Sequence, residues 1–212
     1  KSNLKKVEVL VMMTGFVATL DDPSIDSMTV LKRITTRGTD LEMIDRVNRI
    51  SRAFCADELT LEETFRQIKA MWKEKPHVKC NFGAMAAITG GFAVMFGGTI
   101  PEAGIAALAG FISAFVKLVC RKKQLHMFLE NIICSSVLAL VIGLAVQILP
   151  GVYDKDLLIV SAIMPFVPGA AITNAVFDTL HGDYLSGLAR AAEAFVIAAA
   201  VAAGIGIGMY LI

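Results

Sequence analysis

Residues 157–177 form a run that contains no charged side chain. About 20 such residues are enough to cross the hydrocarbon core of a bilayer. Pro165, Pro168 and Gly169 lie near the middle of the run and should break a helix there. Broken backbone at membrane depth is tolerated only where protein buries it or where it lines a polar cavity, and secondary transporters hold their substrates at such discontinuous helices. The run therefore predicts a broken membrane helix and points to transport.

The composition of the chain agrees with a membrane protein. Hydrophobic residues make up 56% of it and its mean hydropathy is +0.66, which is too high for an ordinary soluble domain. Residues 1–80 nevertheless hold 14 of the 20 Lys and Arg and 12 of the 19 Asp and Glu. We therefore predict a small cytoplasmic α+β module over residues 1–80 and a transmembrane domain over residues 81–212. The net charge of +1 gives no reason to expect a nucleic acid as partner.

The first part of the chain shows alternating and β-branched segments, followed by two helical patterns. Three strands are predicted, over residues 7–11, 16–20 and 27–34. Capping boxes at Thr39–Glu42 and Thr60–Glu63 predict two helices, with Thr39 as the first N-cap and Glu42 reaching back to it. Helical spacing predicts that each helix has a buried side, formed by the following residues: Leu41, Ile44, Val47, Ile50 and Phe54 in the first, and Leu61, Phe65, Ile68 and Met71 or Trp72 in the second.

The chemistry-bearing residues give no sign of catalysis or of a cofactor. No Gly-rich phosphate loop is present, and His77 is the single histidine of the first 80 residues, so no Ser/His/Asp set can be assembled there. The four cysteines form no CxxC pair and are interpreted as free, small hydrophobic side chains. We therefore predict no catalytic residues, no metal site and no cofactor. The chain begins with Lys1 rather than Met, and we expect the natural protein to begin further upstream.

The second part of the chain divides into five predicted membrane spans. They cover about residues 82–100, 103–120, 127–149, 157–177 and 188–212, with Pro101-Glu102 as a tight turn between the first two. The loops carry an uneven distribution of positive charge, with Lys155 alone on one side and these residues on the other: Lys73, Lys75, Lys79, Arg121, Lys122, Lys123 and Arg190. The positive-inside rule then places the N-terminal module in the cytoplasm and the C-terminus outside a multi-pass cell (inner) membrane protein.

Several blocks of residues, in order along nearly the whole chain, match one known family. They are Arg37-Gly38-Thr39-Asp40-Leu41-Glu42, Arg46-Val47-Asn48, Ser51-Arg52, Phe96-Gly97-Gly98, Pro168-Gly169 with Thr173-Asn174 and Asp178, and Gly182-Asp183-Tyr184-Leu185-Ser186-Gly187-Leu188-Ala189-Arg190. Through them the chain resembles the large-subunit, N-terminal half of threonine/serine exporters, a family that includes two-subunit dicarboxylate exporters of the succinate type. The resemblance implies a cytoplasmic module, five spans, export driven by the proton-motive force, and a second half with its own spans.

The broken fourth span supplies the candidate site. Backbone N–H groups after Pro168 and Gly169, together with the side chains of Thr173 and Asn174, are predicted to bind a substrate carboxylate, because a helix N-terminus favours negative charge. The charged residues beyond them are predicted to serve in coupling or gating: Asp178, Asp183, Arg190 and Glu193. Packing alone could also explain the two prolines, and an i,i+3 ion pair could explain Arg190 and Glu193.

Three functions follow from these residues. The first is a subunit of an exporter for a small carboxylate-bearing metabolite, either an amino acid like threonine or serine or a dicarboxylate like succinate. The second is a structural membrane scaffold, and the third is a membrane-anchored enzyme with a hydrolase-like soluble module, for which no catalytic set is present. A broken span leaves half a cavity facing lipid, so we predict a hetero-oligomer with a smaller membrane subunit of four or five spans, and with several copies of each.

Overall fold

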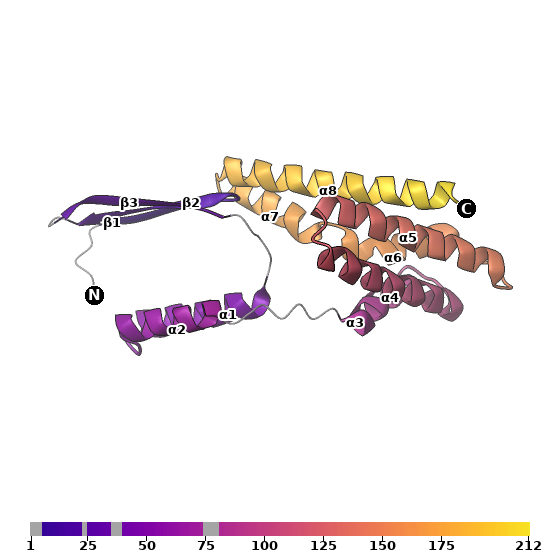
Figure 1. Cartoon of the computed structure of the whole chain (residues 1–212), viewed down its shortest axis with the longest axis horizontal. Coiled ribbons are helices and arrows are strands. Elements are labelled where there is room, and N and C mark those ends of the chain that lie inside the picture. The colour runs from indigo at the N-terminus through magenta and orange to yellow at the C-terminus, as the bar shows by residue number, and fades with distance from the viewer. Residues whose placement is uncertain (1–5, 23–24, 35–39, 74–80) are drawn as a thin grey trace. The chain divides into compact units, whose positions relative to one another are not determined.

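The computed structural model describes residues 6–22, 25–34, 40–73 and 81–212 (Figure 1). The chain separates into two compact units, Lys1–Lys79 and Cys80–Ile212. The first contains a sheet and a pair of helices, and the second is entirely helical in its described part. Each unit is described by itself below.

The three predicted strands are present and form an antiparallel sheet in the order β1-β2-β3. They are β1 (Lys6–Met12), β2 (Gly15–Asp22) and β3 (Ile25–Arg33). Val9 pairs with Ala18, and Ala18 in turn pairs with Val30. The turn between β1 and β2 ends at Gly15, where an added Cβ would lie 2.8 Å from the carbonyl oxygen of Lys32. Glycine is therefore required there by the close approach of β3.

The two helices of this unit are α1 (Leu41–Cys55) and α2 (Leu61–Lys73). The capping box predicted for α2 is confirmed: the backbone N–H of Thr60 donates to Glu63 Oε2 at 3.0 Å, and the N–H of Glu63 donates to Thr60 Oγ1 at 3.3 Å. The cap predicted for α1 is wrong by one residue. Asp40 is its N-cap and accepts from the N–H of Met43, because a carboxylate one position later offers a stronger acceptor.

The predicted buried sides of these helices are largely exposed within the described unit. Met71 is buried, but Leu41, Leu61, Phe65 and Trp72 keep 66–80% of their surface exposed. Thr39, which was predicted as the first cap, lies outside the described residues. Glu42 forms an ion pair with Arg46. Local capping signals thus form helices here without a core of their own.

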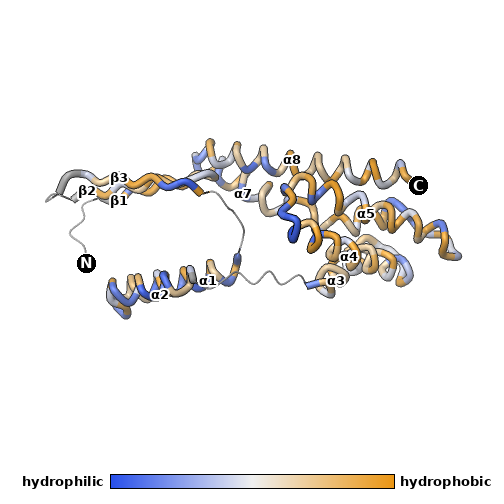
Figure 2. The backbone as a smooth tube through the Cα atoms, in the orientation of Figure 1, coloured by the Kyte–Doolittle hydropathy of each residue, from blue (hydrophilic) through white to orange (hydrophobic). Residues whose placement is uncertain are grey.

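The second unit contains six helices and one 3₁₀ turn in its described part. They are α3 (Phe82–Met95), α4 (Ile100–Lys122), α5 (Met127–Ile148), α6 (Lys155–Ile163), η1 (Met164–Phe166), α7 (Gly169–Leu180) and α8 (Tyr184–Tyr210). Figure 2 shows them as mostly hydrophobic, with a hydrophilic loop joining α4 to α5. Pro101 and Glu102, predicted as a turn, belong to the first turn of α4. Proline is well tolerated at that position, and Glu102 closes a capping box with Thr99.

Three helices of the second unit, α4, α5 and α8, are long and apolar enough to cross a membrane. If the bent pair made of α6–η1 and α7 is one span, the number rises to four. Helix α3 is shorter, with 14 residues. At about 1.5 Å per residue it is about 21 Å long, compared with a hydrocarbon core of about 30 Å. The unit is a helical membrane bundle, and the number of five spans stays a prediction.

Small residues set the closest helix contacts of this bundle. Gly204 of α8 lies against Ile132 and Ser135 of α5, and Gly208 lies against Ser136 and Ala139 further along α5, so the two helices run parallel. Because glycine has no side chain, it lets membrane helices approach closely enough for many dispersion contacts. The core forms around this contact, with the following residues among those buried there: Cys134, Leu138, Ile142, Ile197 and Val201.

Candidate functional site

The predicted break in the fourth apolar segment is present. Helix α6 ends at Ile163, η1 covers Met164–Phe166, and α7 begins at Gly169 at an angle of 59° to the preceding segment. The backbone N–H of Val167 bonds to the carbonyl oxygen of Met164 at 3.3 Å, and that of Gly169 bonds to Val167 at 2.8 Å. Proline has no N–H to donate, so the α-helical ladder gives way to these tighter contacts.

The break lies at the level of the loop that joins α4 to α5. The ring of Phe166 in η1 faces the ammonium group of Lys117, whose Nζ is 5.2 Å from the ring centroid. Lys117 is five residues before the end of α4 at Lys122. At about 1.5 Å per residue this is about 7.5 Å from the helix end, well away from the middle of α4.

Helix α7 continues past that level, accompanied by the first half of α8. Gly187 of α8 lies against Ala175 and Thr179 of α7, whereas Gly204 and Gly208, further along α8, lie against α5. The two stretches therefore form an antiparallel pair that extends beyond the linked ends of α4 and α5 (Figure 1). Gly187 permits this approach, since an added Cβ would lie 3.0 Å from the carbonyl oxygen of Ala175.

An ion pair joins the two helices of this extension. Arg190 Nε of α8 lies 2.8 Å from Asp178 Oδ2 of α7, with the two side chains 37% and 21% exposed. The contacting atoms themselves are buried. The structure thus brings together two of the four predicted coupling residues. Asp183 is the N-cap residue of α8, and Glu193 lies one turn beyond Arg190 with a half-buried side chain.

The predicted substrate-binding residues lie on the outer surface of α7. Pro168 is its N-cap residue, and an added Cβ on Gly169 would meet no atom within 4 Å. Thr173 Oγ1 donates to the carbonyl oxygen of Gly169 at 3.0 Å, one turn earlier in the same helix. Both Thr173 and Asn174 are exposed in the single chain. The helical unit by itself does not enclose Thr173 and Asn174 in a cavity.

A second group of charges, which the sequence did not single out, adjoins the break. Lys117 Nζ and Arg121 Nε of α4 lie 3.9 Å and 3.5 Å from Glu130 Oε1 of α5. The sequence offered one signal for this cluster, because opposite charges at the facing ends of two helices joined by a four-residue loop must lie at the same level.

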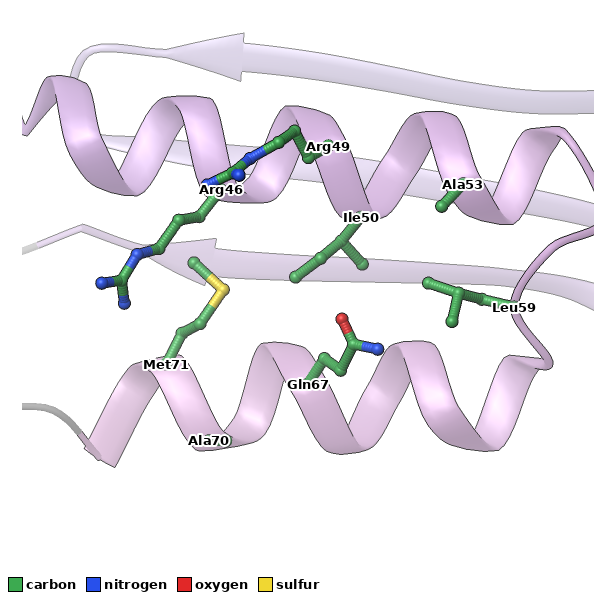
Figure 3. A pocket seen from close by; sticks show the side chains of 8 residues that line it. All are labelled: Arg46, Arg49, Ile50, Ala53, Leu59, Gln67, Ala70 and Met71. Carbon is green, nitrogen blue, oxygen red and sulfur yellow. The ribbon is translucent and has the colours of Figure 1, made fainter.

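The first unit has a groove of its own, between α1 and α2. It encloses about 500 Å³. Ile50 from α1 and Met71 and Gln67 from α2 point into it (Figure 3). Arg46 and Arg49 line one edge, but each is paired with a carboxylate one turn earlier in α1. Among the described residues, no group of three His, Cys, Asp or Glu is placed to hold a metal ion.

The three or four helices that are long and apolar enough to cross a bilayer indicate a multi-pass helical membrane protein. The family model described as "Putative threonine/serine exporter" matches residues 1–212, and the chain belongs to the threonine/serine exporter family. This confirms the resemblance. The family consists of exporters and not of enzymes.

One relative in Mycobacterium tuberculosis (strain ATCC 25618 / H37Rv) carries the name "Probable threonine/serine exporter" and is 23% identical over 203 residues. The match covers 94% of this chain and 37% of the relative, so the chain spans little more than a third of that protein. No solved structure matches the chain significantly.

Proposed function

We propose that this chain is the N-terminal half of a secondary exporter for small solutes that carry a carboxylate. Threonine and serine are the first candidates, because the family and the mycobacterial relative bear these names. A succinate-like dicarboxylate is the second candidate, and the proton-motive force is the proposed driving force. The observation that carries the proposal is the broken helix, where α6–η1 and α7 meet beside charged side chains.

The directions of the helices support counting the bent pair as one crossing. Glu102, at the start of α4, accepts from the N–H of Asp154 at the start of α6, and Phe166 at the end of η1 faces Lys117 near the end of α4. Helices α4 and α6 therefore run the same way. Helices α5 and α8 also run parallel to each other, as five crossings require. A re-entrant loop would instead make α5 and α8 cross in opposite directions.

Topology is tested by a reporter enzyme that is active only outside the cytoplasm, fused after Ile212. We propose a cytoplasmic N-terminal unit and an external C-terminus, so the fusion should be active. A re-entrant loop in place of a fourth span would leave the reporter in the cytoplasm and silent. A fusion in the loop between α4 and α5, at Lys123, serves as the silent control.

Assembly follows from the exposed face of α7. Thr173, Asn174 and the large apolar side chains beside them lie on the surface of the single chain. Polar side chains and broken backbone are costly against lipid, so we propose that a second set of spans covers them, on a smaller membrane subunit of four or five helices or on a fused half. A purified chain that is monomeric and exports alone in liposomes would contradict this.

Transport is tested by export of labelled threonine, serine and succinate from cells or liposomes, with the second half present. Replacing Asn174 by Ala removes hydrogen-bonding groups and should raise the half-saturation concentration about 5- to 150-fold, as about 1–3 kcal/mol predicts. Ser161→Ala is the control, because the Ser161 hydroxyl bonds within α6 to the carbonyl oxygen of Leu157 at 2.6 Å. No export of any of the three solutes by the wild type would overturn the proposed function.

A further inference from the structure

The charged cluster beside the break differs from an ordinary ion pair. Two cations, Lys117 and Arg121, face the single carboxylate of Glu130. Glu130 is 12% exposed and Lys117 is 26% exposed, whereas Arg121 keeps 51% of its side chain exposed and can be hydrated. The two enclosed groups are the ones that lie at the break.

The cluster contains two positive charges and one negative charge, so one positive charge is not neutralised within it. Helix α3 and the η1 turn contain no charged residue. On the other neighbouring elements, Asp156 lies at the opposite end of α6, Asp178 of α7 is paired with Arg190, and Glu193 of α8 has an interaction of its own. No other carboxylate of the described residues lies within 4 Å of Lys117. Glu130 lies closer to Arg121 than to Lys117, so the more enclosed Lys117 is the cation without a close carboxylate, which is costly unless an anion meets it.

The ammonium group of Lys117 also keeps its hydrogen-bond donors available. Its distance of 3.9 Å from Glu130 Oε1 is longer than a hydrogen bond, and its second contact is the face of the Phe166 ring. Within the described part of the chain Lys117 donates no hydrogen bond to another residue. A ring face attracts a cation but accepts no strong hydrogen bond, so it positions the ammonium group without satisfying it.

We propose that Lys117 binds the carboxylate of the transported solute at the helix break, with Phe166 as the wall of the site and Glu130 as the internal carboxylate that holds Lys117 when the site is empty. This inference rests on the proposed function and names the cation that would select for acidic solutes. Amino acids and dicarboxylates share the carboxylate, so either class fits. The ammonium group would exchange its long contact with Glu130 for charge-assisted hydrogen bonds to the solute.

A purely structural role for Lys117 gives different results in a double variant. If Lys117 only neutralises Glu130, then Lys117→Met should reduce protein stability, and Lys117→Met with Glu130→Gln should restore both stability and solute binding. If Lys117 binds the solute, the double variant should restore stability but not binding. Lys117→Arg keeps the charge and should keep part of the binding.

The test measures binding first and export second, on the complete transporter purified in detergent. L-Threonine and succinate are the carboxylate probes, and L-threoninol, in which an alcohol replaces the carboxylate, is the control solute. We expect at least one carboxylate probe to raise the thermal midpoint of the wild type more than L-threoninol does. Lys117→Met should raise the probe concentration that gives half of this shift by about 10- to 100-fold, which is typical of the loss of a hydrogen bond to a charged group.

Lys122→Met is the matched control, because Lys122 is an exposed lysine five residues further along the same helix, and it should bind like the wild type. Equal stabilisation by the carboxylates and by L-threoninol, or unchanged binding in Lys117→Met, would overturn the inference. If binding depends on Lys117 but the wild type exports none of the probes, Lys117 is a carboxylate-binding residue but the proposed function fails. If the wild type exports them and Lys117→Met exports with the same half-saturation, the inference alone fails.

Discussion

The two units of this chain are held together in opposite ways. In the first unit, helix ends are closed by side-chain caps, but among its described side chains of large apolar type Met71 alone is buried. In the second unit, residues such as Leu138, Ile142 and Leu158 are fully buried, and glycines allow the helices to touch. Local signals thus define the elements of the first unit, whereas close packing defines the second. Changes in packing should therefore damage the second unit more.

The largest effect is expected from overpacking the contact between α5 and α8. A side chain at Gly204 would collide with Ser135 Oγ and come within 2.5 Å of the carbonyl oxygen of Ile132. Gly204→Val should destabilise the helical unit by at least about 1–3 kcal/mol. The measurement is the thermal midpoint in detergent, followed by circular dichroism.

The matched control for Gly204→Val is two residues away in the same helix. An added Cβ at Gly206 meets no atom within 4 Å, so Gly206→Val carries the same change in helix propensity without the collision. Equal midpoints for the two variants would mean that α8 does not pack on α5 as described. The comparison therefore separates the effect of helix packing from the effect of helix propensity.

A second prediction compares thiols in the two units. Cys55 of α1 is exposed, whereas Cys120 of α4 and Cys134 of α5 are buried. Maleimide should modify Cys55 rapidly in the native protein and should reach the other two only when the bundle opens. Single-cysteine variants, analysed by mass spectrometry with and without denaturant, give the rates. Fast labelling of Cys134 in the native protein would show that the core of the bundle is open.

The sequence predicted most of the elements, and each error has a physical cause. The helix break at Pro165–Gly169 and the capping box at Thr60 were predicted correctly, because the effects of proline and of side-chain caps depend on only a few neighbouring residues. The start of α4 was missed because proline was taken to end a helix, although it also suits the first helical turn. The short loop between α4 and α5 indicates that their charged ends lie at the same level, but the contact of Lys117 with Glu130 depends on how the two helices pack, so it was missed.

A third, smaller effect is expected at the ion pair between α7 and α8. Asp178→Asn keeps the shape of the side chain but leaves Arg190 without its carboxylate partner. The pair is partly exposed, so the loss of stability should be about 1 kcal/mol, the upper value for a surface pair. A double-mutant cycle with Arg190→Gln measures it through thermal midpoints. Additive single and double variants would show that the pair contributes no coupling energy.

The smallest effect is expected from acidification of the first unit. The pKa of Glu63 is lowered from the ordinary glutamate value of 4.5, first by the hydrogen bond from the backbone N–H of Thr60 and second by the one from its hydroxyl. Because the folded pKa lies below the unfolded value, this cap stabilises α2 fully above about pH 4.5 and is lost as the pH falls through the folded pKa.

Hydrogen exchange of the first turn of α2, measured on the whole chain between pH 6 and pH 3 and corrected for the intrinsic exchange rate, is the readout for this cap. Glu63→Gln cannot ionise, so its protection should depend less on pH than that of the wild type. Glu62→Gln is the control, since Glu62 lies in the same helical turn but the cap is formed by Glu63. If both variants lose protection as steeply as the wild type, then another group titrates and Glu63 does not hold the start of α2. A pH-dependent loss that is confined to this turn, while α5 and α8 stay protected, would show directly that one unit relies on local caps and the other on packing.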